Sequence, residues 1–96
     1  MIARDLVAAE PVQFNGRRFP AAPCDGSTTS HHRVVAWDME LAARWADAAI
    51  RWHWAIETYP PGTGELRRRD IDQMRVNRDD CTRTAIATNL ERAGRT

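Results

Sequence analysis

The chain has 96 residues, of which 14 are Lys or Arg and 13 are Asp or Glu, so its formal net charge is only +1. We expect one small domain over residues 1–96, and the balanced charge does not require a polyanionic partner. Apart from the histidines every basic residue is Arg, which excludes Schiff-base chemistry and a Lys-dependent phosphate-binding loop.

The hydropathy and the first residues of the chain bear on its localisation. No run of about 18 apolar residues is present, so no membrane-spanning helix is expected. The charge pair Arg4-Asp5 stands where a signal peptide needs an apolar stretch, which predicts a cytoplasmic protein. In a reducing compartment, a bond between Cys24 and Cys81 is possible but not favoured.

Residues 1–29 are expected to form an N-terminal arm that carries a short β-hairpin. Asn15-Gly16 tolerates the positive φ angles of a tight turn, and alternating apolar residues flank it between Val12 and Phe19. An isolated hairpin is barely stable in water, so this one is expected to dock on a helix.

A long central helix is predicted over residues 30–59. Ser30 can cap its start, no residue inside the span breaks a helix, and Pro60-Pro61-Gly62 ends it. One apolar stripe with helical periodicity is expected to face the core, and a polar strip lies nearly opposite part of it. The core stripe consists of Val34, Trp37, Leu41, Trp45, Ala48, Trp52, Ile56 and Tyr59. The polar strip consists of Arg33, Glu40, Arg44, Asp47 and Arg51, in which Glu40–Arg44 and Asp47–Arg51 have the spacing of ion pairs.

A second apolar row on this helix is the strongest functional signal in the sequence. Trp54 projects about 200° away from Trp52 around a helix, so the two indoles cannot enter the same core. Trp, Met and Arg are enriched at protein interfaces, which predicts a docking surface. Its expected residues are Met39, Ile50 and Trp54 as apolar anchors, with Arg44 and Arg51 as a polar rim and Ala43 and Ala46 between them. The alternative is that Trp54 packs under the hairpin or the C-terminal helices.

Residues 60–64 are expected to be a Pro/Gly loop, and residues 65–96 to hold two shorter helices. Read as one helix, residues 65–93 have poor apolar periodicity, and a break near Asn77–Asp80 improves it. We therefore predict helices over residues 65–77 and 81–93, with Gly94 as a stop. A single bent helix, forming a long αα-hairpin with residues 30–59, is the alternative. The predicted fold class is mainly α: a long central helix, two shorter C-terminal helices and an N-terminal arm with a hairpin.

Candidate sites for catalysis or metal binding have simpler structural explanations. The set Cys24, His31, His32 and His53 lacks the paired short spacing of zinc ligands. The set Ser27, Ser30, His31 and Asp38 has no nucleophile elbow around it. Gly62-Thr63-Gly64 could hold an anion at a helix start, but a plain connector explains it better. The Asp70/Asp72 and Asp79/Asp80 pairs could bind a hard cation, and for the second pair helix-start acids are the better explanation. We expect no enzyme, no metal, no cofactor and no small-molecule substrate.

The C-terminal third also permits a helix-turn-helix interpretation. A second helix would expose residue types that reach phosphates and base edges, and a run of three Arg could grip a nucleic-acid backbone. The residues concerned are Arg67, Arg68, Arg69, Arg83, Thr84, Thr88 and Asn89. Residues 65–96 nevertheless carry only eight Arg against six acids, and the turn has no Gly.

The leading hypothesis is a small non-enzymatic protein-binding adaptor or inhibitor. Its partner would be another protein or a second copy of itself, bound through the Trp/Arg surface. A phage-encoded inhibitor of a host system would suit the small size and the lack of catalytic motifs. The second hypothesis is a helix-turn-helix DNA-binding regulator.

Overall fold

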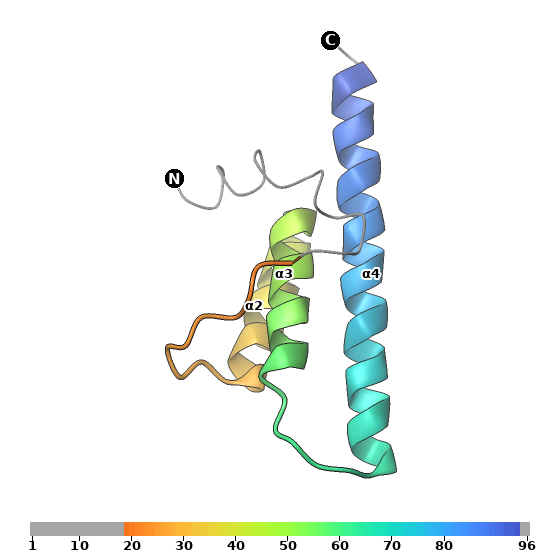
Figure 1. Cartoon of the computed structure of the whole chain (residues 1–96). Coiled ribbons are helices and arrows are strands. Elements are labelled where there is room, and N and C mark those ends of the chain that lie inside the picture. Colours follow the sequence, from red (N-terminus) through yellow and green to blue (C-terminus); the bar gives the residue numbers. More distant parts are fainter. Residues whose placement is uncertain (1–18, 95–96) are drawn as a thin grey trace.

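The computed structural model describes residues 19–94, and in that part of the chain three helices form the regular structure (Figure 1). They are α2 (Thr29–Leu41), α3 (Trp45–Glu57) and α4 (Glu65–Gly94). Helix α3 is the central element, because both α2 and α4 pack extensively against it. The prediction of a mainly α fold is confirmed for these residues, but the predicted order of one long and two short helices is wrong.

Helix α2 begins at the loop that leads from the N-terminal arm. Thr28, and not Ser30 as predicted, is the N-cap, and its hydroxyl accepts a hydrogen bond from the backbone N–H of His31 at 3.2 Å. Thr29 donates to the carbonyl of Ala55 at 3.0 Å. These bonds attach the first turn of α2 to the last turns of α3.

The predicted central helix over residues 30–59 is wrong, because the chain turns back at residues 42–44. Ala43 has a φ of +57°, in the left-handed region. The N–H of Arg44 donates to the carbonyl of Met39 at 2.8 Å, and the N–H of Ala43 to that of Glu40 at 2.9 Å. This pair of bonds is a Schellman motif, in which Ala43 occupies the place usually taken by Gly. The motif satisfies the terminal carbonyls of α2 without a helix-breaking residue.

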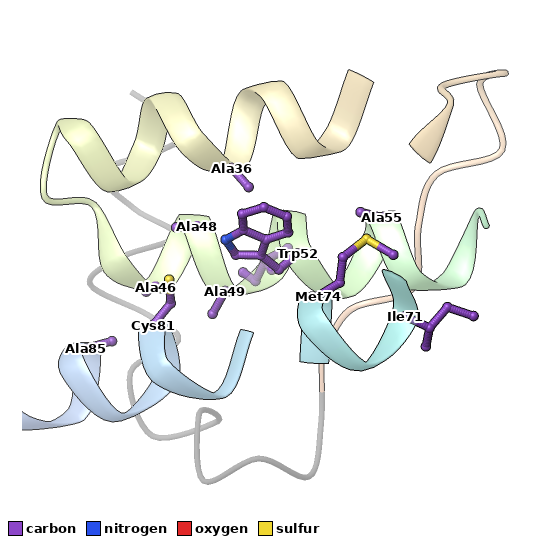
Figure 2. Packing of buried hydrophobic residues seen from close by; sticks show 11 residues of the cluster. Ala36, Ala46, Ala48, Ala49, Trp52, Ala55, Ile71, Met74, Cys81 and Ala85 are labelled. Atoms are coloured by element: carbon purple, nitrogen blue, oxygen red, sulfur yellow. The ribbon is translucent and has the colours of Figure 1, made fainter. Parts of the chain in front are cut away.

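The core contains one large aromatic side chain surrounded mostly by small residues (Figure 2). Trp52 is 1% exposed and lies between α2 and α3, close to Met74 and Cys81 of α4. Alanines on α2 and α3 let the helix backbones approach closely around it: Ala36, Ala46, Ala48, Ala49 and Ala55. The α3 half of the predicted core stripe therefore does face the core.

Residues 65–94 form one continuous helix, so the prediction of two C-terminal helices is wrong. Neither Asp79 nor Asp80 caps a new segment, and the hydroxyls of Thr82 and Thr84 donate to the carbonyls of Arg78 and Asp80 within the helix. The single-helix alternative is right about this segment, but the long partner helix it required is absent from the described part of the chain.

The poor apolar periodicity of α4 has a geometric cause. Its 30 residues span about 45 Å at 1.5 Å per residue, whereas the 13 residues of α3 span about 20 Å. The C-terminal end of α4 therefore extends beyond α3 (Figure 1), so packing on α3 does not require an apolar face on that part of the helix. The predicted hairpin lies outside the described residues except for Phe19, and residues 19–94 contain no strand.

Candidate functional site

The apolar row predicted as a docking surface does not lie on one exposed face. Ile50 is 1% exposed and belongs to the core, and Met39 is partly buried against that core. Trp54 is half-buried, and its indole N–H donates to the carbonyl of Pro20 at 2.7 Å. The edge of its ring meets His32, with centroids 5.6 Å apart. Trp54 thus attaches the segment before α2 to α3. Like the alternative in which Trp54 packs under the hairpin or the C-terminal helices, this gives the indole a partner within its own chain.

The two predicted rim arginines also have intramolecular partners. Arg44 pairs with Asp47 at 2.6 Å, and the guanidinium of Arg51 lies 4.8 Å from the centre of the Trp54 ring. The predicted Glu40–Arg44 pair does not form, because the turn at residues 42–44 leaves Glu40 in α2 and places Arg44 at the N-cap of α3. These arginines stabilise the fold around α3.

Three of the exposed large apolar side chains instead lie in a row on α2. Val34 is 54% exposed, Trp37 47% and Leu41 87%. Their spacing of three and four residues places them in one line along the helix. We call Val34, Trp37 and Leu41 the α2 stripe. Single exposed apolar residues need no explanation, but a continuous row marks a possible contact surface.

The sequence predicts a core position for these three residues, together with the apolar residues of α3. On one straight helix both groups share a side. After the reversal at Ala43, the side of α2 that meets α3 is the one carrying His32 and Ala36, both of which are fully buried. The helical spacing of His32, Ala36 and Met39, four and three residues apart, is the sequence signal that could have indicated this inner face.

The central residue of the α2 stripe is held in position. The Trp37 ring meets Trp52 edge-to-face with centroids 5.6 Å apart, and the guanidinium of Arg33 lies 5.4 Å from the centre of the Trp37 ring. Burying Trp37 against a partner would therefore cost little side-chain entropy, because the Trp37 indole is already ordered.

Opposite charges flank the stripe. Arg33 lies on one side of it and Asp38 on the other, and neither forms an ion pair with any residue in the described part of the chain. The Nε atom of Arg33 is buried and has no hydrogen-bond partner there. The Glu40 side chain points toward the core, where it accepts a hydrogen bond from the buried indole of Trp52 at 2.6 Å. The outer face of α2 is thus apolar at its centre and charged at both margins.

Buried polar groups elsewhere serve packing. Burial, reinforced by the neighbouring Glu40 carboxylate, raises the pKa of the Cys81 thiol to about 12. Burial likewise raises the pKa of Asp47, although Arg44 opposes this effect. With its pKa of about 12, the Cys81 thiol is almost entirely protonated near pH 7 and is not a nucleophile.

Two histidines lie beside arginines. The Nδ1 of His32 is 3.3 Å from Arg51, and that of His53 is 3.2 Å from Arg78. Burial is the main reason why the pKa of each is lowered, and the adjacent guanidinium adds to the effect. At His53 the Glu57 carboxylate, 3.2 Å from Nε2, opposes the lowering more strongly than Arg78 adds to it. His53 also stacks on Phe19 with centroids 4.7 Å apart. Together with Cys24, these histidines form no metal site, since residues 19–94 contain no cluster of three possible ligands.

The residues considered for nucleic-acid binding do not form one surface. Arg67 and Arg83 are separated by about 24 Å along a continuous helix, and no turn presents a recognition helix within residues 65–94. Arg68 pairs with Glu65 at 2.9 Å, and Arg83 pairs with Asp80. The side chain of Arg67 donates to the carbonyl of Pro60 at 3.0 Å, while Arg69 is exposed, Thr84, Thr88 and Asn89 are half-buried, and Thr84 bonds within the helix.

A shallow cleft at the start of α4 corresponds to the anion site considered for Gly62-Thr63-Gly64. Arg67, Arg68 and Arg75 line it, together with Asp72. Arg68 and Arg75 are each paired with an acid three residues earlier, at 2.9 and 3.3 Å. Two of the three arginines are therefore paired with acids, and the cleft keeps one excess positive charge. No helix in the described part of the chain is long and apolar enough to cross a membrane.

Comparison with known proteins does not assign the chain to a family. No family model, no curated protein and no solved structure shows significant similarity to this sequence or fold.

Proposed function

We propose that this chain is a small, non-enzymatic protein-binding module of the cytoplasm, an adaptor or inhibitor, and that the α2 stripe is its contact surface. The observation that carries the proposal is the row of three exposed apolar side chains on α2, with a pre-ordered Trp at its centre. The earlier candidates Met39, Ile50 and Trp54 are not part of this surface, because their packing holds the fold together.

The energetics favour a helical partner face. Burying a large apolar side chain contributes about 1.5–3 kcal/mol, and Trp is among the residues that dominate binding energy at interfaces. Positions 34, 37 and 41 are three and four residues apart, the spacing at which side chains of one helix pack between those of another. An apolar helix face is therefore the partner chemistry that the stripe fits.

Site-specific photo-crosslinking in the organism that produces the protein tests the proposal. A photoreactive phenylalanine at position 41, which is highly exposed, should give an adduct of higher mass. The matched control carries the same group at the exposed position 69 on α4, which lies across α3 from α2. Equal labelling from both positions, or from neither, would show that the α2 stripe is not a contact surface.

The helix-turn-helix alternative is not proposed further. It required two helices in residues 65–94, and that segment is one helix. Its exposed arginines are largely paired with acids three residues away, as in Glu65–Arg68, Asp72–Arg75 and Asp80–Arg83, which lowers the positive potential that nucleic-acid binding requires.

A further inference from the structure

The charges beside the α2 stripe have the spacing of a self-complementary helix pair. With Val34 and Leu41 as a positions and Trp37 as d, Arg33 occupies a g position and Asp38 the following e position. In two parallel helices, the g residue of one chain lies beside the e residue five positions later in the other. Arg33 of one copy would therefore meet Asp38 of a second copy, and the symmetry would form this pair twice.

We propose that the occupant of the α2 stripe is a second copy of this chain, with the two α2 helices packed in parallel across a two-fold axis. This inference rests on the proposed function and names its partner. An antiparallel arrangement would place like flanks together, Arg33 side against Arg33 side, and so would lose both ion pairs. The charges thus favour one orientation as well as one partner.

The arrangement of the helices leaves room for this contact. Helix α3 contacts both α2 and α4 extensively, whereas contact between α2 and α4 is slight. Figure 2 shows α2 and α4 on opposite sides of α3, so the outer side of α2 faces away from the other described helices. A second α2 can therefore lie along it without displacing a described helix.

The size of the contact predicts a weak dimer. Helix α2 has 13 residues and is about 20 Å long, so the pair buries less than the roughly 800 Å² per partner of a standard stable interface. A dissociation constant on the order of 10–100 µM is expected, with the protein mostly monomeric at low concentration.

Sedimentation velocity on the full chain over a concentration series tests the proposal. The wild type should shift from monomer to dimer as its concentration rises. Arg33→Glu and Asp38→Arg should each weaken the dimer about tenfold, because each places like charges together in both symmetry-related pairs. The double variant R33E/D38R restores opposite charges and should return the dissociation constant close to that of the wild type.

Leu41→Glu provides the test of the apolar contact, and circular dichroism confirms that each variant is folded. This variant should remain monomeric throughout, since it places two carboxylates inside the pair. A wild type that stays monomeric up to about 500 µM, or a double variant no better than the single ones, would overturn the dimer. In that case an adduct from position 41 to a different protein would leave the proposed function standing, whereas no adduct at all would overturn both.

Discussion

At the residue scale, the described structure uses its polar side chains chiefly to connect helices. Glu40 illustrates this, because its carboxylate accepts from the Trp52 indole and also lies against the Cys81 thiol, so that one α2 side chain contacts α3 and α4. His53 does the same between Phe19 and Arg78. Of the groups that looked available for chemistry in the sequence, His32 and His53 are thus occupied by intramolecular partners.

The two cysteines should differ sharply in reactivity. Cys24 is exposed, whereas Cys81 is buried with a pKa of about 12, and both are free thiols. In the native protein at pH 8, a disulfide reagent should therefore titrate one thiol per chain, and it should titrate two in denaturant. Cys24→Ser should abolish the native reaction, and rapid labelling of Cys81 in the folded protein would contradict the packing around Glu40.

The stability of the protein should fall on mild acidification. The pKa values of His32 and His53 are lowered in the folded state, mainly by burial, so below about pH 6.5 the unfolded chain binds more protons than the folded one. The stability they contribute is complete above pH 6.5 and is lost as the pH falls through their folded pKa values. Asp47, whose pKa is raised by burial, contributes with the opposite sign.

Urea unfolding between pH 8 and pH 5 measures this effect. The free energy of unfolding should decrease as the pH falls from 7 to 5, and the variant H32N/H53N should show a smaller decrease. A wild-type curve that is flat or rises over this interval would mean that the histidines are not held neutral in the fold.

At the element scale, the turn between α2 and α3 stores strain at a single residue. Ala43 adopts a left-handed conformation that costs an L-residue with a Cβ atom about 1–2 kcal/mol, and a glycine much less. Ala43→Gly should therefore stabilise the protein by about 1 kcal/mol, which corresponds to a rise of roughly 4–8 °C in Tm.

The neighbouring alanine is the control for this prediction. Ala42 has a φ of −87°, which does not favour glycine, so Ala42→Gly should leave the Tm unchanged or lower it. Calorimetry on the two variants separates the expected gain from a general effect of glycine. If Ala43→Gly lowered the Tm, the helix would have to continue through residues 42–44.

At the scale of the whole molecule, order is expected to be uneven along α4. The helix is nearly as long as the longest dimension of the molecule, 49 Å, but α3 covers less than half of its length. Core residues of α4 lie between Ile71 and Ala85, and Leu90 beyond them is exposed. Because most helical stability in proteins comes from packing, the overhanging turns should open more readily than the rest.

Amide hydrogen exchange followed by mass spectrometry tests this gradient. Peptides covering residues 71–85 should exchange slowly, and peptides covering residues 87–94 should exchange much faster. If α2 pairs with a second copy, higher protein concentration should slow exchange in α2 and leave the end of α4 unchanged. Uniform protection along α4 would indicate a contact that the described chain does not supply.

Much of the local structure follows from the sequence alone. Pro60-Pro61-Gly62 ends the helical region before it, and α4 begins at Glu65, as predicted. The helical character of residues 29–94 outside the turns also follows, because these segments are rich in good helix formers. These features depend on φ restriction, missing donors and intrinsic propensity, which act over a few residues.

Only the tertiary structure decided where the helical segments break and which faces they bury. Ala42 and Ala43 favour a continuous helix locally, yet the chain reverses there, because the reversal places Ala36 of α2 and the alanines of α3 around Trp52. Conversely, the polar region around Asn77 remains helical within the long α4. The reason is that burial energy depends on residues far apart in the chain, and it outweighs local differences of less than about 1 kcal/mol per residue. The same reversal turned Val34, Trp37 and Leu41 outward, so the candidate surface itself was decided by tertiary packing.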